Sequence, residues 1–363
     1  MPELAFLPNW PPLANNMFWI GALLAVGVAC GEAVRRFLRL PRITGYAAAG
    51  LALGPGGLGL IDNPVLEDLG VFADVAIGLV LFELGQRLDL AWLRRTPALA
   101  LMGVAESLGA AALVFFTLHY YFDLVPLAAG IAAAIAVSTS PAALMRVAAD
   151  LRAEGQVTER ALIVTAINGV LAFLALTVLI PWLHFEYRGG WLTMVTHPLY
   201  LLGGSAALAL VAGWFTLRLA GLIGKSPERQ FIAVIAMVVM TVGIAIALKV
   251  SVLLALLGMG ALVRNADREH HLVVVDSGNA GQLFYVCLFV ITGASLDLAL
   301  LATALAPMSG LAVVLVHQTA ALYPEIRESV APVVLAAVVM LELAGPIATQ
   351  FALRRAGEAE EGA

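Results

Sequence analysis

The chain has 363 residues, of which 61% are hydrophobic and only 12% are charged, and its formal net charge is −5. Soluble domains carry about 25% charged residues, and a soluble chain of this length cannot hide so much apolar surface in one core. A lipid bilayer can cover that surface, so the composition excludes a soluble globular protein and predicts an integral membrane protein. Both cysteines, Cys30 and Cys287, lie inside apolar runs, which argues against a disulfide framework.

Apolar runs of the length that a membrane-spanning helix needs, roughly 20 residues, recur along the whole chain. The first run has no basic segment before it, so we expect a retained helix rather than a cleaved signal peptide. The sequence therefore predicts an all-α polytopic membrane protein with about 12 transmembrane helices. The predicted spans are Met17–Ala33, Ile43–Ile61, Val71–Leu84, Pro97–Leu118, Pro126–Val147, Ala161–Leu183, Leu199–Leu222, Phe231–Leu248, Val252–Val263, Gly281–Asp297, Leu298–Leu322 and Val330–Leu353.

The loops between these runs alternate in charge. Every second loop is rich in basic residues, and the loops between them are poor in lysine and arginine. By the positive-inside rule the basic loops are cytoplasmic and the N-terminus lies outside. The basic residues are Arg35, Arg36, Arg39 and Arg42, then Arg87, Arg94 and Arg95, then Arg146, Arg152 and Arg160, then Arg218, Lys225 and Arg229, and finally Arg264 and Arg268.

A short motif occurs twice. Residues Gly85–Leu93 share the pattern Gly-x-x-Leu-Asp-Leu-Ala with residues Gly293–Leu301, and each copy follows a Leu-Phe pair. The first copy falls at the cytoplasmic end of its span and the second at the outer end. Opposite placement of matching segments is typical of inverted-topology repeats.

Each half also contains a helix breaker. Ser138–Pro141 interrupts the fifth run, and Ala306–Gly310, with Pro307 and Gly310, interrupts the eleventh. Proline removes a backbone donor, and inside a bilayer the freed carbonyls must bond to protein or line a wet cavity. Paired interruptions in two repeats predict two discontinuous helices that cross at an ion site near the midplane.

Several of these motifs, in this order, resemble one transporter family. Pro41–Pro55 resembles the second-helix signature of the cation:proton antiporter-2 family, the sodium/hydrogen exchanger and potassium-efflux group. Gly78–Gly85 looks like that family's next helix, and Ser138–Pro141 like its first broken helix. Phe289–Asp297 and Glu342–Glu358 also fit.

The resemblance covers nearly the whole membrane region. It implies a sodium/hydrogen exchanger-like transmembrane domain at residues 1–358, with a short acidic tail at 359–363. It also implies a multi-pass homodimer in the cell inner membrane that exchanges Na⁺ or K⁺ for H⁺. Neither a cofactor nor a nucleic-acid partner is expected.

The sixth span departs from the family pattern. Such antiporters usually carry Asn-Asp, Asp-Asp or Gln-Asp there, whereas this chain reads Asn168-Gly169. An amide can offer its carbonyl oxygen to a cation but cannot titrate. The aspartate that the resemblance implies as the proton carrier is therefore missing.

The second repeat is also short. Pro141 follows Gly85 by 56 residues, whereas Pro307 follows Gly293 by 14, a difference of 42 residues. That difference corresponds to about one spanning helix with its loops. We therefore expect the second repeat to lack a counterpart of Pro97–Leu118.

Twelve spans with an outside N-terminus would put Arg354 and Arg355 outside, against the positive-inside rule. Three explanations stay open: a real deletion with unusual insertion of the last helices, a degenerate gene, or a segment Leu298–Leu322 that does not span simply.

Two carboxyl groups could replace the missing carrier. Glu106 lies near mid-depth of Pro97–Leu118, and Glu342 lies near the middle of Val330–Leu353. A charge at the bilayer centre costs about 2.5–3.5 kcal/mol on insertion scales, so such residues are protonated, paired or functional.

Two further acidic residues are interpreted as solvated charges at helix ends. Asp74 lies near the outer mouth, and Glu83 lies one turn before Arg87, with which it could form an i,i+4 ion pair.

These patterns favour a secondary active antiporter whose only metal is the transported cation. The competing hypothesis is a transport-inactive or uncoupled degenerate homologue, favoured by Gly169 and the short repeat. An intramembrane enzyme finds no support, because the His-Glu-x-x-His and Gly-x-Ser-x-Gly motifs are absent. The expected oxygen ligands of the cation are Ser138, Thr139, Ser140 and Asn168, and the expected proton carriers are Glu106 and Glu342.

Overall fold

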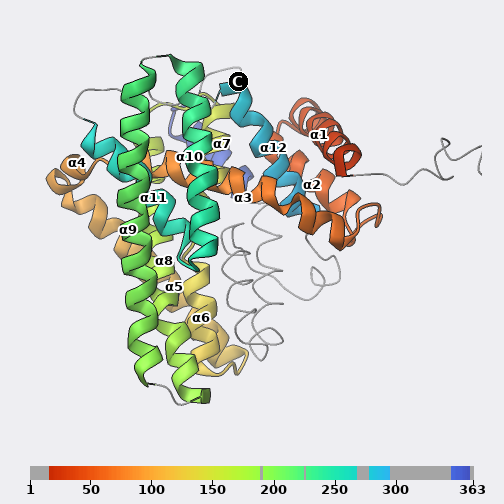
Figure 1. Cartoon of the computed structure of the whole chain (residues 1–363). Coiled ribbons are helices and arrows are strands. Elements are labelled where there is room, and N and C mark those ends of the chain that lie inside the picture. The colour runs from red at the N-terminus through yellow and green to blue at the C-terminus, as the bar shows by residue number, and fades with distance from the viewer. Residues whose placement is uncertain (1–15, 189–190, 225, 268–277, 295–344, 360–363) are drawn as a thin grey trace, which may run out of the picture.

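The computed structural model describes residues 16–188, 191–224, 226–267, 278–294 and 345–359. Within these ranges all regular structure is helical, which confirms the predicted fold class (Figure 1). The helices are α1 (Asn16–Ala33), α2 (Arg42–Leu53), α3 (Asn63–Gln86), α4 (Leu90–Arg95), α5 (Pro97–Tyr121), α6 (Pro126–Ala136), α7 (Pro141–Asp150), α8 (Gln156–Arg188), α9 (Trp191–Ile223), α10 (Pro227–Ala247), α11 (Val252–Ala266) and α12 (Gly278–Ala294). A π-helical turn, Val34–Leu38, follows α1, and residues 345–355 form a last helix.

The described helices include six stretches that are long and apolar enough to cross a membrane. These stretches are Asn16–Leu38, Pro97–Tyr121, Pro126–Asp150, Gln156–Ile180, Val195–Ile223 and Pro227–Ala247, and shorter apolar helices lie at Val252–Ala266 and Gln282–Ala294. The protein is therefore a multi-pass membrane protein, as its composition predicts. The predicted span Leu298–Leu322, the break at Pro307 and Gly310, and most of the predicted last span lie outside the described residues.

The second helix is shorter than predicted. We expected it to run from Ile43 to Ile61, but α2 ends at Leu53. Gly54 has extended backbone with ψ of 177°, and the next residue is Pro55, which has no N–H to continue the helix. The chain then turns back, so that the N–H groups of Leu60 and Ile61 both donate to the Leu53 carbonyl.

The helices form two groups joined by α3. Figure 1 shows α1, α2 and α12 gathered on one side of the molecule, while α5, α6 and α8 pack together at another part of it. Helix α3 contacts both α12 and α11, and its buried side chains enter two separate apolar clusters. Phe82 of α3 is fully buried in the cluster that includes α6, α8 and α11, whereas Val80 faces the cluster around α12.

Glycines let two pairs of helices approach to backbone contact. Gly85 of α3 faces Gly260 of α11, and a Cβ on either residue would meet backbone atoms of the other helix. Gly293 of α12 in the same way faces the backbone of α2 at Ala47, and Gly50 of α2 faces the Val290 carbonyl. Small residues at such crossings replace side-chain packing by backbone packing, which is common between membrane helices.

These two crossings involve the duplicated motif. Gly85 and Gly293 are the matching glycines of the two copies, and a Cβ on either residue would meet backbone atoms of a neighbouring helix. The shared glycine thus has the same packing role in both copies. The inverted repeat itself stays a prediction, because much of its second half lies in residues 295–344, outside the described residues.

The C-terminal end lies at the face that carries the basic loops. The side-chain amide of Gln350 donates to the Arg39 carbonyl at 3.1 Å, and the Glu358 backbone carbonyl accepts from the N–H of Glu154 at 3.2 Å. Arg354 and Arg355 therefore lie on the same side as Arg39. Twelve simple spans with an outside N-terminus would put these two arginines on the opposite side. Their placement on the side of Arg39 agrees with the positive-inside rule.

The α3–α11 contact gives the first testable prediction. Gly260→Ala puts a Cβ against the Phe82 carbonyl and the Gln86 N–H of α3, which are backbone atoms that cannot turn away. We expect a loss of about 1–3 kcal/mol in unfolding free energy, measured as a lower melting temperature in detergent. Gly243→Ala is the matched control, because a Cβ there has nothing within 4 Å. Equal melting temperatures for the two variants would contradict the close crossing.

Candidate functional site

The fifth predicted span is interrupted at its centre. Helix α6 ends at Ala136 and α7 begins at Pro141, with the intervening residues outside helical conformation. Pro141 occupies the first turn of α7, where its missing N–H costs nothing. The Ser140 hydroxyl accepts from the Ala143 N–H at 3.4 Å as the N-cap, and the Ser138 hydroxyl donates to the Ile135 carbonyl at 2.7 Å. These two serines therefore bond to the freed backbone of the break.

The third hydroxyl of the break, that of Thr139, reaches α8. It accepts a hydrogen bond from the side-chain Nδ2 of Asn168 at 3.0 Å. Asn168 is 2% exposed and lies in the middle of α8. The bond to Thr139 points this amide into the break, where the sequence analysis expects a cation ligand.

Asn168 also binds α5 through two neighbouring residues. Its Nδ2 donates to Oε2 of Glu106 at 2.7 Å, and its Oδ1 accepts from the hydroxyl of Ser107 at 2.8 Å. Both N–H donors and the carbonyl of the buried amide are therefore engaged. One side chain connects α5, the α6–α7 break and α8.

Helix α5 presents a narrow buried face to α8. Gly103 lies where a Cβ would approach Ile167 at 3.2 Å, and Ser107, one turn later, is 3% exposed. Glu106 is at the edge of this face, so the residue is exposed while its Oε2 bonds Asn168. The site is thus a carboxyl at the edge of a helix contact, held by a buried amide.

The arrangement brings together groups suited to a hard monovalent ion and a proton. Carboxylate and hydroxyl oxygens are ligands of such cations, and a carboxyl can also carry a proton, which hydroxyl and amide groups cannot do at ordinary pH. One carboxyl group cannot hold a proton and bind a cation at the same time. The chemistry that this cluster supports is therefore reversible competition between H⁺ and a cation.

The predicted site residues fall into three sets. Thr139, Asn168 and Glu106 come together, whereas the hydroxyls of Ser138 and Ser140 bond to their local backbone. Glu342, Pro307 and Gly310 lie outside the described residues. The sequence analysis missed Ser107, because the sequence does not show which face of α5 turns toward α8. The only signal for this residue was its position beside Glu106.

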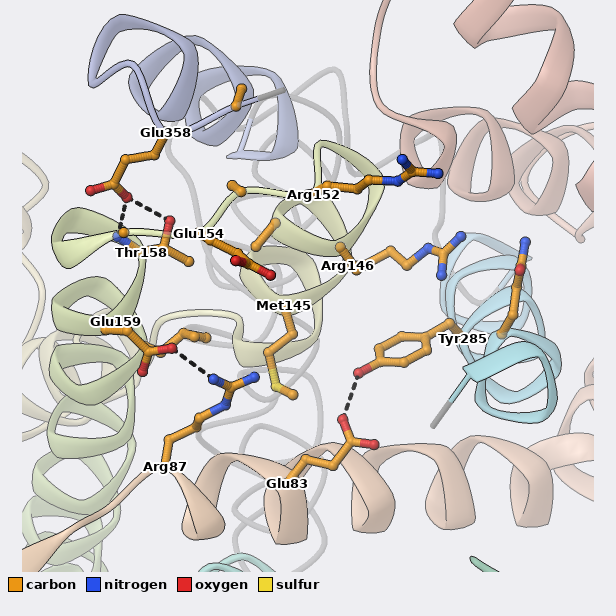
Figure 2. A pocket seen from close by; sticks show the side chains of 17 residues that line it. Glu83, Arg87, Met145, Arg146, Arg152, Glu154, Thr158, Glu159, Tyr285 and Glu358 are labelled. Carbon is orange, nitrogen blue, oxygen red and sulfur yellow. Dashed lines mark hydrogen bonds and ion pairs between the residues drawn. The ribbon is translucent and has the colours of Figure 1, made fainter. Parts of the chain in front are cut away.

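A second polar region is a cavity of about 910 Å³ at the basic-loop face (Figure 2). Its walls come from the ends of α3, α7, α8 and α12 and from the C-terminal segment, and Asn168 and Glu106 are not among its lining residues. The lining charged residues are Glu83, Arg87, Arg146, Arg152, Glu154, Glu159 and Glu358.

The charges in this cavity do not pair as predicted. Arg87 forms its ion pair with Glu159 of α8 at 2.7 Å, and Glu83 instead accepts from the Tyr285 hydroxyl of α12 at 3.3 Å (Figure 2). The expected pair within α3 is therefore wrong. The neighbouring helices supply closer partners that spacing along a single helix cannot reveal.

The C-terminal segment binds the start of α8 through one carboxylate. Gly357, at φ of +71°, reverses the chain after the last helix. Glu358 then accepts from the N–H of Val157 at 2.7 Å. It also accepts from the N–H and the hydroxyl of Thr158, each at 2.8 Å (Figure 2). These bonds hold the pKa of Glu358 below its usual value, and the bond from the Val157 N–H has the largest effect. We call this contact the Glu358 clamp.

Comparison with known proteins adds independent findings. A family model described as sodium/hydrogen exchanger, transmembrane, matches residues 22–360. The iron transporter MagA of Paramagnetospirillum magneticum (strain ATCC 700264 / AMB-1) is 36% identical over 63 residues, which is 17% of this chain and only 14% of the length of that relative.

Solved structures of the sodium proton antiporter MjNhaP1 from Methanocaldococcus jannaschii share the fold. The structure at pH 8 aligns with a TM-score of 0.66 and the electron-microscopy structure with 0.64. Each is 16% identical, and each alignment covers 94% of this chain and 96% of the other.

The Glu358 clamp predicts a pH-dependent stability. Because the folded pKa of Glu358 is depressed, the clamp stabilises the protein above the unfolded pKa of about 4.3 and loses this effect as pH falls through the folded pKa. Glu358→Gln should lower the melting temperature at neutral pH, and its difference from the unmodified protein should shrink below about pH 4. Glu67→Gln, at an exposed position of α3, serves as the control. If the difference in melting temperature between Glu358→Gln and the unmodified protein does not change with pH, the charge of Glu358 has no part in the clamp.

Proposed function

Because the chain belongs to the sodium/hydrogen exchanger family, whose members are transporters and not enzymes, we propose that it exchanges a monovalent cation for a proton at the cluster of Glu106, Thr139 and Asn168. The observation that carries the proposal is the Asn168 amide, which joins a carboxyl to the interruption of a spanning helix. In this proposal the cation binds to oxygens of Glu106 and Thr139. The same carboxyl carries the proton in the other half of the cycle.

The proposed carrier is displaced from the position that the family resemblance implies. The expected aspartate would follow Asn168 on α8, where this chain has Gly169. Glu106 approaches the same amide from α5, with its Oε2 at 2.7 Å from Asn168 Nδ2. A carboxyl donated by a neighbouring helix would thus restore a titratable group beside Asn168.

The remaining features of the proposal follow from the resemblance. The transported ion is Na⁺ or K⁺, the membrane is the cell inner membrane, and the protein is a homodimer. Glu342 stays an alternative carrier.

A second candidate function is that of a transport-inactive or uncoupled homologue. Gly169 favours it, because α8 itself offers no titratable side chain next to Asn168. Proton flux measured in the purified protein separates the two functions.

The decisive variant is Glu106→Gln, which preserves shape and removes the titration. In proteoliposomes with a pH-sensitive dye, Na⁺, K⁺ or Li⁺ should drive proton flux through the unmodified protein, and Glu106→Gln should reduce that flux to the level of empty liposomes. Glu67→Gln, an exposed carboxyl of α3 away from the cluster, should keep the flux.

Two results would oppose this assignment. Undiminished flux in Glu106→Gln would transfer the carrier role to another carboxyl, with Glu342 next. Absence of flux in the unmodified protein with all three cations would favour the inactive homologue.

The hydroxyl of Thr139 has its own test. Thr139→Val removes a proposed cation ligand and should raise the KM for the cation about tenfold, equivalent to about 1.4 kcal/mol. Thr117→Val is the matched control, because this hydroxyl of α5 donates to the Leu113 carbonyl of its own helix, and the variant should leave the KM unchanged. A KM unchanged in Thr139→Val would exclude this hydroxyl as a ligand.

A further inference from the structure

The arginines at the basic-loop face differ in whether the protein itself supplies their partners. Several are held by other side chains: Arg42, Arg87, Arg146 and Arg264 pair with carboxylates at 2.7–3.6 Å, Arg160 donates to Gln156, and Arg218 lies over the Trp214 ring. Other arginines of this face pair with no carboxylate of the described residues. Among these are Arg35, Arg36, Arg39, Arg354 and Arg355.

Two segments far apart in the chain bring these last arginines together. Some lie in the turn between α1 and α2, and the others end the last helix. The buried amide of Gln350 donates to the Arg39 carbonyl at 3.1 Å, and Arg354 follows Gln350 by four residues, or about 6 Å along the helix. We call Arg35, Arg36, Arg39, Arg354 and Arg355 the arginine patch.

Large apolar side chains are exposed beside the arginine patch. Phe37 is 79% and Leu38 is 63% exposed in the turn, and Phe351 is 65% exposed on the last helix. The turn ends the apolar stretch Asn16–Leu38, which is long enough to cross a membrane. The patch therefore lies at the depth where acyl chains meet headgroups, a boundary that suits the apolar stem and charged end of arginine.

We propose that the arginine patch binds an anionic phospholipid. The planar guanidinium group fits a phosphate through two parallel hydrogen bonds, which is why arginine is favoured where phosphate is recognised. Basic residues clustered at the cytoplasmic end of a membrane helix are also typical of binding to anionic headgroups. In this site the arginines contact the lipid phosphate, while the acyl chains lie against Phe37 and Phe351.

The charge of the patch favours this occupant over a second copy of the chain. A two-fold contact centred on the patch would bring arginines of one copy against the same arginines of the other. Like charges in such a contact repel, and the nearby carboxylate of Glu32 already bonds to Arg42 at 3.1 Å. A phospholipid supplies both the negative charge and the apolar surface that match the patch.

A lipid in this site would connect the two ends of the protein. The arginines come from the α1–α2 turn and from the last helix, so one bound headgroup joins two segments that the Gln350 amide already connects. A ligand that binds only the folded protein raises its stability. The lipid should therefore raise the melting temperature, and this effect does not depend on ion exchange.

The test compares two lipids that share acyl chains and differ in headgroup charge. Purified, delipidated protein in a neutral detergent is mixed with phosphatidylglycerol or phosphatidylcholine, and bound lipid is counted by native mass spectrometry. Phosphatidylglycerol should bind at least tenfold more tightly, since each basic residue near an anionic headgroup contributes about fivefold in affinity. It should also raise the melting temperature, whereas phosphatidylcholine should not.

Two triple variants locate the site. Arg36→Gln/Arg39→Gln/Arg355→Gln should lose both the preference for phosphatidylglycerol and its effect on the melting temperature. The matched control, which removes the same charge from the same face and should keep both, is Arg160→Gln/Arg218→Gln/Arg264→Gln. If the first triple variant does not fold, Arg36→Gln and Arg355→Gln as single changes should each weaken phosphatidylglycerol binding about fivefold.

Three kinds of result would overturn the proposal. Equal binding of the two lipids, or a first triple variant that keeps its preference, would exclude the patch as a lipid site. The same rise in melting temperature with inorganic phosphate at matched concentration would show a site for the free ion only. A lipid-free dimer that the first triple variant converts to a monomer would make the patch an interface between copies of the chain.

Discussion

A buried amide in the middle of a membrane helix is the constraint on which the candidate site depends. Polar groups at bilayer depth must find partners within the protein, because the hydrocarbon offers none. Asn168 meets this requirement with bonds to Glu106 and Ser107 on α5 and to Thr139 in the α6–α7 break. The same three bonds that remove its desolvation cost also fix the relative position of a carboxyl and a broken helix.

In the proposed function, a carboxyl lies beside Asn168 without the aspartate that the family resemblance implies. Gly169 leaves α8 without a titratable neighbour for Asn168, and Gly103 allows α5 to approach α8 closely at Ile167. Glu106 then reaches the amide from the side. In the proposed function a carboxyl on α5, rather than one on α8, contacts the amide.

Contacts far from the site determine where α8 and α3 lie. Backbone-to-backbone packing at Gly85 and Gly260 fixes α3 against α11, and the Glu358 clamp joins the C-terminal segment to the first turn of α8. The clamp also puts the C-terminal end at the basic-loop face. That placement removes the conflict with the positive-inside rule that counting twelve simple spans creates.

The sequence by itself determined the membrane class, the helical fold and the break at Pro141, because these follow from composition, apolar run length and backbone chemistry that act locally. It also marked Asn168 and Glu106 as candidate site residues. Only the tertiary structure decided that Glu106 meets Asn168, that Ser107 shares the amide, and that Arg87 pairs with Glu159 rather than with Glu83. These contacts join residues 61 to 72 positions apart. The physical reason is that nearly every face of a membrane helix is apolar, so hydrophobic periodicity does not reveal which face turns toward another helix; packing alone selects it.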